Sequence, residues 1–141
     1  MGKVMSLALA LLAASAFHAS AQQSTTARSG EIAPAHCTLT KATLCKEGGC
    51  TPSDSFGELK LPTKVSIDFL RKVLLGVSPD GFATASSVDS LALADNQLIA
   101  FGVDHGSSWM AHASATDPSI TIAVSSQNTV LSAFGTCVAA N

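Results

Sequence analysis

The sequence has little charge of either sign and no long hydrophobic run beyond its first residues. Lysine and arginine number eight, aspartate and glutamate ten, and the formal net charge is −2. Proteins that bind nucleic acid or anionic membrane surfaces carry basic patches, so this balance argues against either partner. No stretch after residue 21 is long and apolar enough to span a bilayer, so we expect no membrane span.

Familiar catalytic motifs are also missing. The chain contains no G-x-S-x-G nucleophile elbow, and its histidines show neither HExxH nor His-x-His spacing. Paired carboxylates of a glycoside hydrolase would have to come from five aspartates, most of which lie in predicted turns. These are Asp68, Asp89, Asp95, Asp104 and Asp117. Aspartate in a turn ordinarily forms hydrogen bonds with the backbone. Since the motifs above are also missing, we expect no catalytic residue, no cofactor and no metal.

Residues 1–21 have the pattern of a secretory signal peptide. Lys3 provides a basic start, Val4 to Phe17 are apolar or small, and Ala19-Ser20-Ala21 is an A-x-A cleavage site. Residues 22–36 are polar and predict a flexible segment at the mature N-terminus. We therefore expect an exported bacterial protein, either periplasmic or secreted.

The four cysteines predict two disulfides, because an even number in an exported chain normally forms bridges. A four-thiolate zinc site usually shows two C-x(2–4)-C pairs, and here only Cys45 and Cys50 come close to that spacing. Gly48 and Gly49 let the short loop turn back, which favours Cys45–Cys50 together with Cys37–Cys137. Swapped partners among the first three cysteines stay open. The long bridge is expected to join the first and last strands, close the structure and leave fewer open edges.

Short strands are predicted through the first part of the domain. Cys37, Leu39 and Lys41 alternate with Thr38, Thr40 and Ala42, which indicates a strand up to Cys45. Further strands are predicted over 65–69, 73–76 and 82–87, with Leu70-Arg71-Lys72 as a hairpin turn. An amphipathic helix over Ile67 to Leu75 is the alternative to that hairpin. Residues 57–63 are interpreted as a connector, and residues 88–93 as either a strand or a short helical turn.

The clearest strands lie between Gln97 and Cys137. Residues 98–103 are almost wholly apolar, which predicts a strand covered on both faces or a strand at the middle of a small barrel. Asp104-His105-Gly106 then forms a hairpin turn. Residues 108–114 alternate, with Trp109, Ala111 and Ala113 on one face and Met110 and His112 on the other. Strands at 120–125 and 129–137 complete the series.

Strands spaced by about 10 to 12 residues with polar turns are typical of an all-β fold. We expect residues 37–141 to form a single domain, a small antiparallel meander barrel or sandwich of about six to eight strands stapled by disulfides. Consecutive strands should pair with their neighbours.

Three residues are candidates for ligand binding: Trp109, His105 and His112. Trp109 is the one tryptophan of the chain and is interpreted either as a core residue or as the wall of a pocket, since small barrels can enclose one small molecule. His105 at the hairpin tip and His112 on the next strand would hold a metal only if the register brought them together; otherwise they are solvated surface residues, as is expected of His36. The core prediction also includes Phe69, Phe82, Phe101 and Phe134.

Several short motifs carry a resemblance. They are the segment from His36-Cys37-Thr38 to Cys50, the strand pair from Val65 to Gly76, Leu98 to Gly102 followed by Gly106-Ser107-Ser108-Trp109, and Phe134-Gly135-Thr136-Cys137. In their order they resemble a functionally uncharacterised family of small exported bacterial proteins that are rich in β-structure and contain disulfides. That resemblance implies export and a β fold, and it assigns no functional residue.

The architecture is also similar to that of periplasmic C-type lysozyme inhibitors, which are exported β-barrels with disulfides. Their inhibitory loop carries a Ser-Gly-x-x-Tyr motif, and this sequence contains no tyrosine. Similarity of architecture does not carry the function over.

The leading functional hypothesis is a non-enzymatic module that binds a protein or a small apolar ligand in the cell envelope or outside the cell. An apolar cavity beside Trp109 would favour a ligand, and a fully packed interior would favour surface recognition. The alternatives are a small secreted hydrolase that uses aspartates or His105 around the Asp104 loop, and a structural or envelope-stress protein.

Overall fold

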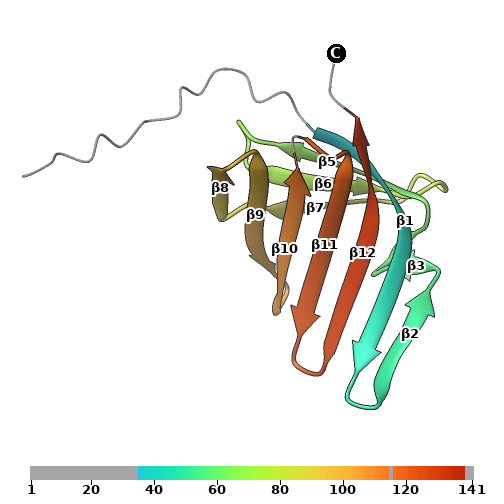
Figure 1. Ribbon diagram of the computed structural model, residues 1–141. Helices are drawn as coiled ribbons and strands as arrows, with labels where there is room; N and C mark the ends of the chain where they lie inside the picture. The colour runs from blue at the N-terminus through green and yellow to red at the C-terminus, as the bar shows by residue number, and fades with distance from the viewer. Residues whose placement is uncertain (1–34, 115, 139–141) are drawn as a thin grey trace, which may run out of the picture. The chain divides into compact units, whose positions relative to one another are not determined.

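Every regular element in the described part of the chain is a β-strand (Figure 1). The computed structural model describes residues 35–114 and 116–138, so the predicted signal peptide and residues 22–34 of the predicted flexible segment lie outside it. The strands are β1 (Ala35–Lys46), β2 (Gly49–Ser53), β3 (Ser55–Phe56), β4 (Leu59–Lys60), β5 (Thr63–Asp68), β6 (Val73–Val77), β7 (Ala83–Ser87), β8 (Ser90–Ala94), β9 (Gln97–Asp104), β10 (Ser107–Ser114), β11 (Ser119–Ser126) and β12 (Thr129–Val138). Within these residues no helix has the length and apolar character needed to cross a membrane.

Ten strands form one antiparallel sheet, and β3 pairs with β4 in a separate hairpin. The order across the sheet is β7-β6-β5-β1-β12-β11-β10-β9-β8. One side of β1 pairs along its length with β12, and the other side pairs first with β5 and then with β2. The all-β antiparallel fold is thereby confirmed. The expectation that consecutive strands joined by short turns pair with each other is wrong for β7 and β8, which lie at opposite ends of the sheet order. β1 joins two meanders, β5 to β7 and β8 to β12.

The structure contains more strands than the expected six to eight because the segment between the first two predicted strands is not a plain loop. Residues 49–53 add β2 to β1, and residues 55–60 form the β3–β4 hairpin. Residues 88–93, left open between strand and helical turn, contribute to β8. The predicted turn at Leu70-Arg71-Lys72 is confirmed, since Asp68 Oδ1 accepts hydrogen bonds from the backbone N–H groups of Leu70 and Arg71 at 3.1 and 2.9 Å.

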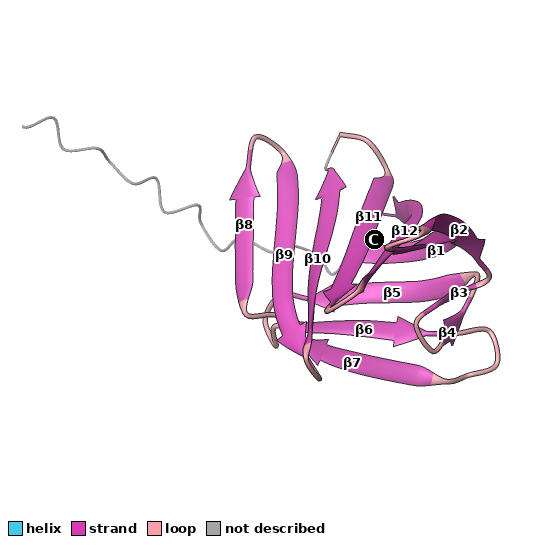
Figure 2. Cartoon of the chain, turned by 90° about the horizontal axis from the view of Figure 1, so that it is seen from below, coloured by secondary structure: helices cyan, strands magenta, loops and turns pink. Residues whose placement is uncertain are grey.

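The sheet curls into a half-barrel (Figure 2). Strands β5, β6 and β7 run crosswise to β8, β9, β10 and β11, so that the inner faces of the two groups lie over each other. The chain passes directly from the edge strand β7 to the opposite edge strand β8. This crossing is held by two backbone hydrogen bonds, from Val88 N to Lys72 O at 2.8 Å and from Asp89 N to Phe101 O at 2.9 Å.

The core lies on the concave face, where alternate residues of each strand point inward. The largest fully buried apolar side chains are Leu39, Ile67, Ile120 and Ile122. On β10 the predicted alternation is confirmed, because Trp109, Ala111 and Ala113 are buried while Met110 and His112 are exposed.

Three of the four phenylalanines predicted for the core are exposed, and that prediction is therefore wrong for Phe82, Phe101 and Phe134. Only Phe69 packs against the core. On β9 the inward positions belong to Ala100 and Gly102, while Ile99, Phe101 and Val103 point outward. The prediction that residues 98–103 are covered on both faces is wrong for the same reason. The small inward residues of β9 leave space for the side chain of Trp109, which comes from the neighbouring strand β10.

A β-bulge interrupts the alternation of β1. The register with β12 shifts between Leu39 and Lys41, so Thr40 is the extra residue. After the bulge the inward-facing residues change from odd-numbered to even-numbered positions. Cys37 and Leu39 are buried before the bulge and Ala42 after it, while Lys41 is exposed. The prediction that Lys41 shares a face with Leu39 is wrong.

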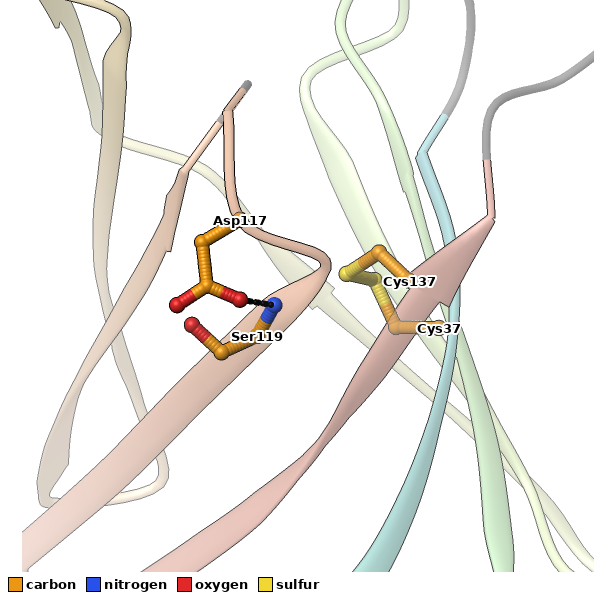
Figure 3. The surroundings of a disulfide bond; sticks show 4 residues. All are labelled: Cys37, Asp117, Ser119 and Cys137. Atoms are coloured by element: carbon orange, nitrogen blue, oxygen red, sulfur yellow. Dashed lines mark hydrogen bonds between the residues drawn. A yellow bond between two sulfur atoms is a disulfide. The ribbon is translucent and has the colours of Figure 1, made fainter.

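Both favoured disulfides are confirmed, Cys37–Cys137 and Cys45–Cys50. Each joins residues directly opposite one another in an antiparallel pair, with Cα atoms 3.9 and 4.0 Å apart. Figure 3 shows Cys37–Cys137 between β1 and β12, beside the turn in which Ser119 N donates to Asp117 Oδ1 at 3.1 Å. The bridge joins the first and last strands, as expected. It does not close the sheet, because β1 and β12 are neighbours within it and β7 and β8 lie at the two ends of the strand order.

Removal of the long bridge should destabilise the fold more than removal of the short one. The sequence separations are 100 residues for Cys37–Cys137 and 5 for Cys45–Cys50. Chain entropy assigns the long loop about 5 kcal/mol and the short one about 2 kcal/mol. Chemical denaturation of the Cys37→Ala/Cys137→Ala and Cys45→Ala/Cys50→Ala variants measures both losses, and equal losses would contradict this account.

Candidate functional site

A pocket of about 720 Å³ opens on the concave side of the half-barrel. Its walls come from β6 and β7 on one side, from β9, β10 and β11 on the other, and from the β3–β4 hairpin. Its volume lies within the range of about 300 to 1,000 Å³ that is typical of small-molecule sites. The curl of the sheet creates this space, because the inner faces of the two strand groups do not fill it.

Trp109 forms part of the pocket wall and is only 5% exposed. It lies opposite Gly102 in the β9–β10 register. A Cβ atom at Gly102 would lie 2.6 Å from Cε2 and Cζ2 of the indole and 2.3 Å from the backbone oxygen of Ser87. Only glycine at this position leaves room for the indole and for the backbone of Ser87 to lie this close. Within the described residues, Nε1 of Trp109 is buried and has no hydrogen-bond partner.

The other buried lining residues are apolar. Phe56 and Leu59 come from the β3–β4 hairpin, Val65 from β5 and Ile122 from β11. Leu59 takes the space beside Gly76, since a Cβ at Gly76 would lie 2.6 Å from Leu59 Cδ1. The hairpin therefore packs over β6 and supplies one apolar wall.

The lining also includes two acids, Glu58, which is exposed, and Asp104, which is half-buried. Asp104, at the end of β9, accepts a hydrogen bond from Ser86 Oγ on β7 at 2.7 Å, and its other oxygen pairs with Nδ1 of His105. His105 and Gly106 form a two-residue turn with φ values of 45° and 78°. Glu58 lies in the turn of the β3–β4 hairpin. Among the residues that the structure describes, no lysine or arginine lines the pocket.

The three residues predicted to bind a ligand do not lie together. Trp109 and His105 both line the pocket, whereas His112 lies on the outer face of β10, opposite Ile99 and Thr121. The β9–β10 register thus separates His112 from the hairpin tip. Across residues 35–114 and 116–138, no group of three or more His, Cys, Asp or Glu side chains is placed to hold a metal ion.

Most of the aspartates accept hydrogen bonds from the backbone or lie in turns, as predicted. Asp68 caps the turn after β5, Asp89 Oδ2 accepts from Val103 N at 2.8 Å, and Asp117 accepts from Ser119 N. Asp95 is in the β8–β9 turn with a positive φ of 51°. Of the five aspartates considered for a carboxylate pair, only Asp104 lines the pocket.

The Asp80 carboxyl group, which does not line the pocket, has a lowered pKa. The hydroxyl of Ser78 donates to Asp80 at 2.6 Å and the backbone N–H of Phe82 donates at 3.3 Å, and these bonds lower the pKa of Asp80. They favour the ionised carboxylate, which stabilises the turn between β6 and β7.

Sequence reasoning missed the β3–β4 hairpin as a part of the site. Residues 57–63 were expected to be a connector, yet Phe56 and Leu59 are both buried and flank a two-residue turn at Gly57 and Glu58. Gly57 has a positive φ of 64°. Two apolar residues on either side of a glycine-containing pair are the local signal that would have indicated this hairpin.

No family model, curated protein or solved structure matches the chain. The pocket is therefore interpreted from its own geometry and chemistry.

The Gly102→Ala variant tests the packing of Trp109. The new methyl group would collide with the indole and with the backbone of Ser87, so we expect a loss of about 1 to 3 kcal/mol and a displaced indole. Trp109 is the one tryptophan and the chain lacks tyrosine, so a shift in its fluorescence emission reports the displacement directly. Gly48→Ala is the control, because no atom lies within 4 Å of its Cβ position. Unchanged stability and emission in Gly102→Ala would refute the close packing.

Proposed function

We propose that this protein is an exported, non-enzymatic binding domain that holds a small apolar ligand in the pocket beside Trp109. The observation that carries the proposal is the pocket itself, which has a size suited to a small molecule and walls that include Trp109, Phe56, Leu59 and Ile122. Transfer of an apolar molecule from water to such walls is favourable by about 25 cal/mol for each Å² removed from water.

The disulfides support an extracytoplasmic location. Two bridges link all four cysteines, and disulfides persist in oxidising compartments. Together with the signal-peptide pattern of residues 1–21, this supports export of a bacterial protein to the periplasm or the medium.

A small ligand fits the geometry better than a protein partner at this site. The apolar walls face into a concavity, and the exposed rim is formed by turns and the ends of strands. Protein partners generally bury flatter surfaces of about 800 Å² on each side.

Binding can be measured directly from the emission of Trp109. We expect the neutral apolar probe N-phenyl-1-naphthylamine to bind the oxidised chain with one-to-one stoichiometry and to quench that emission. Val124 lies opposite Trp109 on β11 and lines the pocket, so Val124→Phe should fill the space and weaken binding about tenfold or more. Ala123→Phe, on the outward face of the same strand, is the matched control. Binding in the pocket would be contradicted if both variants kept their affinity for the probe, or if both lost it.

One observation favours a second candidate, a small hydrolase. The Asp104 carboxylate pairs with Nδ1 of His105 at the pocket rim, an arrangement that orients an imidazole as a general base. The Ser86 hydroxyl, however, donates to Asp104 and not to the imidazole, and His105 is 95% exposed. Ser86 is therefore not placed to act as the nucleophile. In a hydrolysis at this dyad, a water molecule activated by His105 would attack the substrate.

The hydrolase candidate is tested with a panel of chromogenic esters and glycosides. If the dyad is catalytic, His105→Ala and Asp104→Ala each abolish a detected activity while the thermal unfolding transition is retained. Activity that survives both substitutions, or no activity on any substrate, removes this candidate.

A further inference from the structure

The charges at the pocket rim are of one sign. Glu58 and Asp104 line the pocket, and within residues 35–114 and 116–138 no lysine or arginine does. Building on the proposed function, we infer that the ligand is an apolar cation, which places a hydrocarbon or aromatic body in the pocket and an amine or ammonium group at the rim. The pocket would then discriminate against an anion with the same apolar body.

Glu58 supplies an uncompensated charge. It is exposed at the tip of the β3–β4 hairpin, and in residues 35–114 and 116–138 no lysine or arginine pairs with it. The nearest cation along the chain, Lys60, pairs with Asp80 at 3.5 Å. Glu58 therefore remains available to a ligand.

Asp104 supplies a positioned charge on a different strand. The hydrogen bond from Ser86 and the contact with His105 hold its carboxylate at the rim, and its side chain is 34% exposed. A partly buried carboxylate interacts with a cation more strongly than a fully solvated one, because the effective dielectric constant is lower.

The walls suit the apolar body of such a ligand. Trp109 and Phe56 are aromatic and both line the pocket. They are 5% and 9% exposed, so a hydrocarbon or aromatic body packed against them is removed from water. The apolar walls and the acidic rim thus favour the same ligand class.

The test uses three molecules with one apolar body: octyltrimethylammonium, 1-octanol and octanoate, each below its aggregation concentration. Binding to the oxidised chain is measured by Trp109 fluorescence and by calorimetry at pH 8, above the range in which histidine ordinarily titrates. We expect the cation to bind about tenfold or more tightly than octanoate, with the alcohol between them, and the difference to shrink at high salt. Equal affinities would overturn the inference and leave the proposed pocket function standing, whereas no binding of any of the three would overturn both.

Glu58→Gln identifies the source of the preference. It should reduce the ratio of cation to anion affinity several-fold while octanol binding stays unchanged. Glu47→Gln makes the same charge change in the exposed β1–β2 turn, away from the pocket, and should leave the ratio unaltered. The same reduction in both variants would show that net charge, and not the pocket rim, sets the preference, and would overturn the inference.

Discussion

The pairing of β1 with strands on both of its sides is the constraint on which the rest of the structure depends. β1 connects the β5–β7 meander to the β8–β12 meander, and Cys37–Cys137 fixes its register against β12. The bulge at Thr40 then changes the parity of its inward face. Gly135 permits this approach, because a Cβ there would lie 2.0 Å from the backbone oxygen of Thr38. Without this junction the two meanders would not face each other across a common concavity.

The pocket follows from how side-chain size is distributed across the curled sheet. Inward positions on β9 and β10 are mostly small, with Ala100, Gly102 and Ala111 beside the large Trp109. Several large residues, including Phe101 and Met110, point outward. The part of the concave face formed by β9 and β10 therefore carries few large groups, and the β3–β4 hairpin covers the concave face only in part. The space that remains combines apolar walls with an acidic rim, which is why the proposed ligand is small, apolar and positively charged.

Local patterns in the sequence predicted most of the long strands, several turns and both disulfides. They also placed Trp109 inward and His112 outward on β10. They failed where the outcome depends on contacts between distant segments. Phe101 and Phe134 were assigned to the core by their hydrophobicity, yet the preceding residues Ala100 and Ala133 take the buried positions and strand alternation places the two phenylalanines outside. The bulge at Thr40 and the packing of Leu59 on Gly76 likewise arise from tertiary contacts. The resemblance to a family of small exported bacterial proteins stays a prediction.

The central claim, that the pocket beside Trp109 binds a ligand, is tested most directly by nuclear magnetic resonance of the ¹⁵N-labelled oxidised chain during titration with octyltrimethylammonium. The single indole gives one isolated Nε1–H signal. We expect this signal and the backbone amides of Leu59, Gly76 and Val124 to shift together and to saturate, while those of Phe101 and His112 stay in place. Shifts confined to the outer face of β9 and β10, with the indole signal unmoved, would contradict the account.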